Sequence, residues 1–462
     1  MTEETRKLPT GFGRLWTAQT VSSLGDGVSH AALPLLALTL TRDPMALAVV
    51  TAAGTLPWLL FGVVGGALVD RWDRRRTMWV ADAARAALLA IPAAAAALDM
   101  LSISLLAAVA FLLGLGGLFF DTAATAYLPD LLSRDPRLLE RANSRLRGAQ
   151  TAMSGFAGPP AGSALLTLGR AVPLLADAVS FALSALLVRS LPATPRPAPQ
   201  ARESLLRQAR AGAAHVFRNR LLLGLALRPA VGNIAFLAVE TVLALFAHER
   251  LGLDPLGFGL LLTAEAAGGL LGAAIASSLG RRLGTGTALT CTAAVEGLAI
   301  LGLAAAPDPY TAGLALAVCG AGMGATMVLA PSLRQAIVPA HLIGRVTSTS
   351  RMLAMCAAPF GALLGGWLAT TYDVRTPLYI AAGLLLTMTA LTSTMTSNHQ
   401  IEAALRTATT PPSEPDHPGT KSPAPERPQQ DPARKPAGHT TTTDIEMPSR
   451  PRPSREDSMP TG

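Results

Sequence analysis

Long apolar segments recur along residues 1–397 of this 462-residue chain and decide what it can fold into. Each is about 20 residues long, which lets a helix cross roughly 30 Å of hydrocarbon. Half of all residues are hydrophobic and only 15% are charged, whereas soluble domains carry about 25% charged residues. The sequence therefore predicts an all-α polytopic membrane protein, embedded in a lipid bilayer, and excludes a soluble multidomain protein.

We count twelve such segments, with a polar gap between the sixth and the seventh. The first six cover residues 16–40, 46–69, 77–98, 102–127, 148–168 and 172–191. The other six cover residues 221–247, 257–279, 287–306, 311–330, 347–371 and 377–397. Because backbone groups in hydrocarbon must be hydrogen-bonded internally, each segment is predicted to be a transmembrane helix.

Positive charge lies on one side of this alternating arrangement. The loops of that side hold 23 lysines and arginines, in residues 1–15, 70–77, 128–147, 189–220, 280–286 and 331–346. The loops of the other side hold four, namely Arg42, Arg170, Arg250 and Arg375. Since short cytoplasmic loops are enriched in these residues, both termini are predicted to be cytoplasmic. The net charge of +8 is explained by these loops, so no nucleic-acid partner is expected.

A weak internal repeat divides the chain into two halves. Arg145 and Pro159 recur 200 positions later as Arg345 and Pro359. Two six-helix bundles related by such a repeat are common among membrane transporters. The proline- and threonine-rich C-terminal segment cannot bury enough apolar surface to fold. The predicted domains are a first half at 1–191, a cytoplasmic linker at 192–220, a second half at 221–397 and a disordered cytoplasmic tail at 398–462.

Sequence signatures of enzymes and of ATP-driven pumps are missing from the sequence. A phosphate-binding P-loop needs a lysine, and no lysine lies between Lys7 and Lys421. The three cysteines all lie in apolar segments and are expected to be small core residues. We therefore expect no enzyme activity, no cofactor and no metal site. Transport, if that is the function, must draw on an ion gradient.

Residues 65–76 read GGALVDRWDRRR and separate the second and third apolar segments. Four arginines and two aspartates cannot lie in hydrocarbon, which predicts a tight turn at the membrane surface. The order Gly-x-Leu-x-Asp-Arg-x-x-Arg-Arg resembles the loop between helices 2 and 3 of major facilitator superfamily transporters. Asp73 stands where that pattern usually has a glycine. The form Asp-Arg-Trp-Asp-Arg-Arg resembles the branch that holds macrolide-efflux and siderophore-exporter types.

The resemblance implies two six-helix bundles with the substrate bound between them near the middle of the membrane. It also implies a lock, in which an acidic residue of the fourth helix pairs with this loop and closes the inner gate. On this chain the expected lock consists of Gly66, Asp70, Arg71, Arg74, Arg75 and Asp121. An ion pair that only holds helices together is the structural alternative.

The fifth apolar segment contains Gly155, Gly158, Pro159 and Gly162. Small residues at this spacing let helices approach closely, and proline distorts a helix. The pattern resembles the Gly-Pro-x-x-Gly motif of export-type antiporters, although Ser163 replaces an expected glycine. This motif favours export over uptake, while glycine and proline are also common in membrane helices without such a role.

Asp26 and His30 are the candidate residues for proton coupling. A charge at the centre of a bilayer costs at least about 2.5–3.5 kcal/mol, so a membrane-embedded acid indicates a function. Asp26 lies between Gly25 and Gly27, and His30 follows at i+4 on the same helix face. Alternatively, Asp26 caps a break in the helix and His30 is a hydrogen-bonded interior histidine.

Further polar residues are predicted in the other apolar segments. Glu240, Glu265 and Asn233 are candidates for lining the substrate cavity, and the two acids can also be paired structural residues. Asp82 and Arg85 share one face of the third helix and are expected to neutralise each other.

The sequence predicts a proton-coupled exporter of amphipathic drugs or secondary metabolites, monomeric and located in a bacterial inner membrane. A proton is favoured over sodium because Asp26 has a neighbouring histidine and no cluster of hydroxyl and carbonyl ligands. A siderophore or dedicated metabolite exporter and an uptake symporter remain alternatives. A non-transporting membrane sensor or assembly protein is the alternative of another class.

Overall fold

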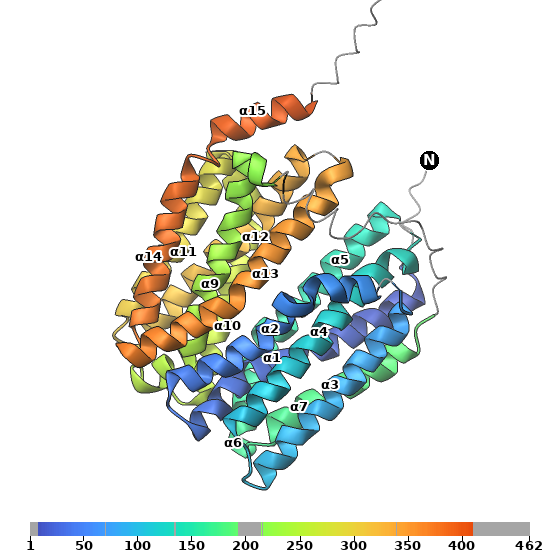
Figure 1. Ribbon diagram of the computed structural model, residues 1–462, viewed down its shortest axis with the longest axis vertical. Helices are drawn as coiled ribbons and strands as arrows, with labels where there is room; N and C mark the ends of the chain where they lie inside the picture. Colours follow the sequence, from blue (N-terminus) through green and yellow to red (C-terminus); the bar gives the residue numbers. More distant parts are fainter. Residues whose placement is uncertain are drawn as a thin grey trace, which may run out of the picture. The chain divides into compact units, whose positions relative to one another are not determined.

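The computed structural model describes residues 8–69, 71–133, 135–192, 214, 216–338 and 340–409. Throughout these residues every regular element is a helix (Figure 1). Ten helices in this part of the chain are long and apolar enough to cross a membrane. The predicted all-α polytopic class is confirmed. The count of twelve spans stays a prediction, since the first and fifth predicted spans are not among the ten; the fifth is divided into shorter helical pieces.

The first six predicted spans correspond to the helices up to α7. Five of these spans are single helices: α1 (Thr10–Leu40), α2 (Pro44–Val69), α3 (Arg74–Ala97), α4 (Ile103–Leu131) and α7 (Val172–Arg189). The fifth is a continuous run of α5 (Pro136–Gln150), the π-helical segment η1 (Thr151–Ala157) and α6 (Gly158–Leu168). The second six are α9 (Arg220–Glu249), α10 (Pro255–Leu283), α11 (Thr285–Ala305), α12 (Pro309–Ile337), α13 (Ala340–Thr371) and α14 (Thr376–Ser393).

Asp-Pro pairs mark the start of four helices. Asp135, Asp254 and Asp308 cap α5, α10 and α12 by accepting hydrogen bonds from first-turn N–H groups. The carboxylate of Asp43 accepts one from Met45 in α2. The proline that follows each aspartate needs no hydrogen-bond acceptor at the first helical position. These pairs explain why α2, α10 and α12 begin two residues before the predicted starts at 46, 257 and 311.

One predicted loop and part of the predicted tail are helical instead. Residues 128–147 were expected to be a loop, but α4 continues to Leu131 and α5 begins at Pro136. In α5, Leu138 and Ala142 are buried while the arginines face outward. The prediction was wrong because an amphipathic helix has too little apolar content to stand out as an apolar run.

The tail was also expected to be disordered from residue 398, but α15 covers Asn398–Thr409. The Asn398 side chain donates to the carbonyl of Leu283 at 3.0 Å and accepts from the N–H of Gly286 at 2.9 Å. It thereby satisfies backbone groups at the turn between α10 and α11, and Ile401 is buried beside it. The prediction was wrong for 398–409; residues 410–462 lie outside the described residues.

Helix packing is dense within each predicted half and continues between the halves along two seams (Figure 1). α2 packs along α13, and α10 packs along η1 and α6. The predicted linker falls largely at 193–213, outside the described residues. The division into two halves therefore stays a prediction.

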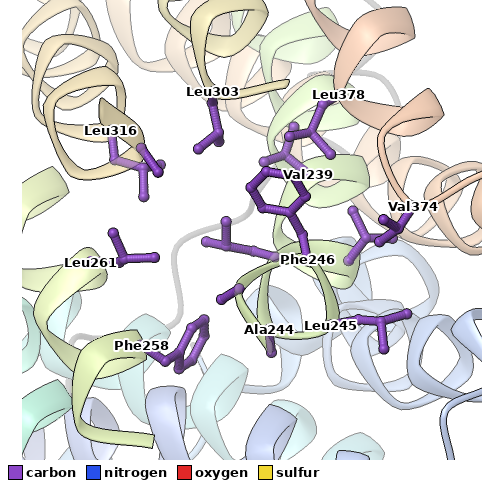
Figure 2. Packing of buried hydrophobic residues seen from close by; sticks show 14 of the residues in the cluster. Val239, Ala244, Leu245, Phe246, Phe258, Leu261, Leu303, Leu316, Val374 and Leu378 are labelled. Carbon is purple, nitrogen blue, oxygen red and sulfur yellow. The ribbon is translucent and has the colours of Figure 1, made fainter. Parts of the chain in front are cut away.

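The hydrophobic cores differ between the two ends of the helices. We call the end that carries Arg14, Arg75 and Arg281 the basic end. At the opposite end one cluster joins Ala31 and Leu47 to residues of α9–α14. In that cluster Phe246 of α9 lies among side chains from several neighbouring helices, including Phe258, Leu303 and Leu378 (Figure 2). None of the clusters at the basic end joins residues of both predicted halves. The two halves therefore share a core at the end opposite the basic end.

We predict that Gly272→Leu destabilises the protein by disrupting the close packing of α10 against α12. A Cβ at Gly272 would overlap the backbone carbonyl of Ala321. Overpacking of this kind costs about 1–3 kcal/mol. The matched control is Gly383→Leu, because a Cβ at Gly383 meets nothing within 4 Å. Thermal unfolding in detergent should show a midpoint several degrees lower for the first variant only; equal midpoints would contradict this packing.

Candidate functional site

Arg85 of α3 lies among four carboxylates from four helices. Its Nη2 donates to Oδ1 of Asp26 in α1 at 2.9 Å, and its Nη1 lies 3.5 Å from Oδ1 of Asp82. Asp177 of α7 and Asp121 of α4 also lie within electrostatic range. The Phe181 ring covers the guanidinium group at 3.7 Å. The closest of these contacts, between Asp26 and Arg85, is an ion pair that joins α1 to α3.

Hydroxyl groups position the two deepest carboxylates. Ser184 donates to Oδ2 of Asp82 at 2.6 Å, and Ser180 donates to Oδ1 of Asp177 at 3.0 Å. Ser29 of α1 donates to Oδ2 of Asp177 and so ties α1 to α7.

Exposure distinguishes Asp26, Asp82 and Asp177. Asp82 and Asp177 are 0% and 1% exposed, whereas 44% of the Asp26 side chain is exposed. Asp26 is therefore the most exposed of these three acids.

The sequence predicted part of this arrangement. The contact between Asp82 and Arg85 is confirmed. Asp177, Ser180 and Ser184 were not recognised as a group, although their i, i+3, i+7 spacing puts them on one face of an otherwise apolar helix.

Gly25 and Gly27, which flank Asp26, allow α1 to pack closely against its neighbours. A Cβ at Gly25 would overlap the side chains of Asp177 and Ser180. A Cβ at Gly27 would lie 2.7 Å from the backbone of Ser154.

His30 belongs to a second cluster, one helical turn from Asp26. Its Nε2 lies 3.0 Å from Oε1 of Glu240 in α9, so this contact joins the two predicted halves. Glu265 of α10 lies within electrostatic range of both. The His30 side chain is 47% exposed. Asp26 and His30, the two candidates for proton coupling, therefore contact different residues: Asp26 pairs with Arg85 and His30 with Glu240.

Asn233, the third cavity candidate, is bonded to the backbone. Its Nδ2 donates to the carbonyl of Ala354 at 2.8 Å and links α9 to α13. Its side chain is half-buried.

The loop between α2 and α3 is held by a different acid than predicted. Arg74 donates to the carbonyl of Ala126 at 3.0 Å and pairs with the carboxylate of Asp130, both in α4. Asp121 instead is exposed and lies in electrostatic range of Arg85. The expected partner was wrong because α4 continues past Pro129 and brings a later acid to the loop.

The other residues of the expected lock differ in the contacts that they make. Arg75 donates to the carbonyl of Leu191 at 2.7 Å, at the C-terminal end of α7. Tyr127 donates to the carbonyl of Pro192 at 2.8 Å, and Arg14 to that of Ser190 at 2.8 Å. These donors satisfy carbonyl groups at the C-terminal end of α7, which have no hydrogen-bond partner within the helix. Arg71 is exposed, Gly66 lies in the last turns of α2, and Asp70 is outside the described residues.

The glycine-proline motif of the fifth span lies against two helices. Gly158 faces Gly27 of α1 so closely that a Cβ would lie 2.5 Å from its Cα, and a Cβ at Gly162 would overlap the backbone of Val28. A Cβ at Gly155 would lie 2.8 Å from Ala266 of α10. The π-helical segment η1 directly precedes Gly158-Pro159-Pro160. The predicted close approach and helix distortion are confirmed, since prolines cannot donate to the helical ladder.

Charged clusters inside the membrane-spanning part of a polytopic helical bundle are typical of membrane proteins with a substrate or ion pathway. Residues 9–416 match the family model described as "Transmembrane secretion effector". The chain is 30% identical over 394 residues to the multidrug efflux pump Tap of Mycobacterium tuberculosis (strain ATCC 25618 / H37Rv), covering 81% of this chain and 88% of that protein.

Solved structures of other transporters share the fold. A bacterial homologue of the iron transporter ferroportin in the inward-facing state has a TM-score of 0.69 at 17% identity, covering 85% of this chain and 100% of that one. The nucleoside transporter NupG has a TM-score of 0.63 at 16% identity, covering 84% of this chain and 100% of that one. The chain belongs to the transmembrane secretion effector family of the major facilitator superfamily. It is a multi-pass membrane transporter of small molecules.

We predict that Arg74 and Asp130 are coupled in stability, whereas Arg74 and Asp121 are not. Each of Arg74→Asp and Asp130→Arg leaves a partly buried charge without its counter-charge and should lower the thermal stability. The double variant should recover part of the loss, with a coupling free energy of at least about 1 kcal/mol. In the matched cycle, the effects of Arg74→Asp and Asp121→Arg on stability should be additive. Additive effects with Asp130 and coupled effects with Asp121 would instead identify Asp121 as the partner of Arg74.

Proposed function

We propose that this protein exports amphipathic small molecules, such as drugs or secondary metabolites, by proton antiport. Its similarity to a multidrug efflux pump supports export. The observation that carries the coupling is the ion pair of Asp26 with the guanidinium of Arg85, since Asp26 is far more exposed than Asp82 and Asp177.

Protonation of Asp26 removes the negative charge that pairs with Arg85. The guanidinium then remains held by Asp82 and Phe181, so α1 loses its ion pair to α3, while the hydrogen bond from Ser184 to Asp82 still joins α7 to α3. Release of the proton restores the attraction between Asp26 and Arg85. A proton taken up or released at Asp26 thereby changes how firmly α1 is held in its own half.

Alternating access follows from the uneven contact between the proposed halves. If the basic end is cytoplasmic, as the arginine distribution favours, the shared core at the opposite end corresponds to a closed external side. Arg74 with Asp130, and Arg75 with the end of α7, then brace the cytoplasmic side of the first half. Both termini of the described chain would lie in the cytoplasm of a bacterial cell, and we expect the transporter to act as a monomer.

We predict that Asp26→Asn abolishes transport driven by a proton gradient. Everted membrane vesicles that contain the protein are energised, and the uptake of a fluorescent amphipathic dye is recorded. An amide cannot exchange the proton, so the initial rate should fall by at least about tenfold, while the purified variant should still bind the dye.

The matched control is Glu296→Gln, a substitution at another membrane-embedded acid. Glu296 of α11 accepts a hydrogen bond from Thr326 at 3.2 Å, which glutamine can also accept. This variant should transport normally. Unchanged gradient-driven uptake in Asp26→Asn would reject Asp26 as the proton carrier. Dye movement in the opposite direction would favour the uptake symporter, and no movement of any dye would favour a dedicated metabolite exporter or a sensor.

A further inference from the structure

The contact between His30 and Glu240 lies at the boundary of the hydrophobic core that the two proposed halves share. Helices α1 and α9 both begin at the basic end and run toward the opposite end. On α1 the members of the shared core begin at Ala31, directly after His30. On α9, Val239 directly precedes Glu240 and residues 242–247 follow it, all within this core (Figure 2). The contact therefore borders the closed end of the molecule.

The apolar part of this closure carries no charge, whereas the contact of His30 with Glu240 does. Nε2 of His30 lies 3.0 Å from Oε1 of Glu240. When the imidazole is protonated, the contact is an ion pair beside an apolar core, where water screens the attraction only weakly. When the imidazole is neutral, the attraction between opposite charges is lost and only a hydrogen bond remains. Of the two side chains, His30 is the more accessible, at 47% exposed against 11% for Glu240.

We propose that protonated His30 and Glu240 form a latch that holds the end opposite the basic end closed, and that loss of the proton from His30 weakens the latch. This inference rests on the export function proposed above and adds a second residue, besides Asp26, through which a proton acts on the transporter.

The latch also gives a direction to the movement. A proton bound at His30 stabilises the state in which the opposite end is closed. If that end is external, as the arginine distribution favours, protons from outside bind while it is open and promote its closure. Asp26 pairs with Arg85 of α3, so a proton there acts within the first proposed half. A proton at His30 instead acts on the contact between the two proposed halves.

Few charged groups face His30 from the helices that pack against α1. Glu240 faces it from α9, and Glu265 of α10 lies within electrostatic range. Asp177 of α7 accepts a hydrogen bond from Ser29, the residue before His30. The helices α2, η1 and α6 contain no charged residue. The groups near His30 in this part of the chain are therefore acidic, and His30 is the one among them that gains a positive charge on protonation.

The other charged groups around α1 have partners elsewhere. Asp26 pairs with Arg85, and Asp121 of α4 lies in electrostatic range of that pair. Helix α5 packs against the first turns of α1, where Trp16 donates to the carbonyl of Arg145 at 3.3 Å. These groups belong to the part of α1 between His30 and the basic end.

The test measures how far the two proposed halves separate at the end opposite the basic end. Spin labels are attached to cysteines introduced at Met100, before α4, and at Tyr310, in the first turn of α12, after the native cysteines are replaced by alanine. Both side chains are exposed. Double electron–electron resonance on the purified full-length protein, without substrate or gradient, gives the populations of short and long distances at about pH 6 and about pH 9.5.

In the protein with native His30, the ratio of open to closed molecules should rise with pH. His30→Gln should raise this ratio about tenfold at the lower pH, because the positive charge is lost, and should abolish the pH response. His30→Lys should keep the end closed at both pH values, because lysine stays charged. Glu240→Gln should open the end at both pH values, whereas Glu296→Gln should behave like the protein without substitutions.

Several results would overturn the inference. Equal populations with His30 and with His30→Gln would do so, as would a His30→Lys variant that opens as the pH rises. Misfolding cannot open one His30 variant and close the other, so broad distances in both variants also contradict the latch. A pH response that is lost in Glu265→Gln but kept in Glu240→Gln would assign the partner to α10 and refute the pair.

The latch and the proposed function can fail separately. Asp26→Asn should keep the pH response of the distances, because Asp26 is not part of the latch. If Asp26→Asn loses gradient-driven transport while the His30 variants show unchanged distances, the proposed function stands and the latch is refuted. If the distances respond as expected while Asp26→Asn transports normally, the latch stands and Asp26 is rejected as the proton carrier.

Discussion

The cost of holding ionised side chains among apolar helices constrains this structure more than any other interaction. Arg85 is held by Asp26, Asp82 and the ring of Phe181, and its contacts draw α1, α3 and α7 together. Serine hydroxyls satisfy the remaining oxygens of Asp82 and Asp177. An isolated charge in this position would be strongly unfavourable, so the three helices can move apart only as far as the charges remain paired or become protonated.

Helix α1 is the element that both charged clusters share. Asp26 directs it toward α3 within the first proposed half, and His30 directs it toward α9 in the second. Glycines at 25 and 27 allow the same helix to lie against α7 and η1 with almost no space between the backbones. The proposed proton-coupling residue and a contact between the two proposed halves therefore lie on the same helix, one turn apart.

The class of fold was readable from the sequence because long apolar runs have few alternative structures. Features that depend on partners from distant parts of the chain were less accessible. Asp121 has the residue type expected of the loop's partner, yet Asp130 is the acid that reaches Arg74. The pairing of His30 with Glu240 joins residues 210 positions apart, and no local pattern predicts it.

Helix ends and amphipathic helices were also misjudged, for a physical reason. Apolar content marks the part of a helix inside the membrane, whereas Asp-Pro caps and outward-facing arginines determine where it begins. The aspartates before α10 and α12 and the charged helix α5 illustrate both cases. A search for Asp-Pro pairs beside apolar runs would have corrected most of these boundaries.

The contacts of Asn398 determine how far the C-terminal end of the chain can be shortened. The N-terminus of α11 begins at a glycine without a side-chain cap of its own, and the Asn398 carboxamide supplies the missing acceptor from 112 positions away. A shortened expression version that stops at Ser397 would leave this helix end bare, whereas one that stops after Thr409 keeps it covered. Affinity tags and fluorescent reporters therefore belong beyond residue 409.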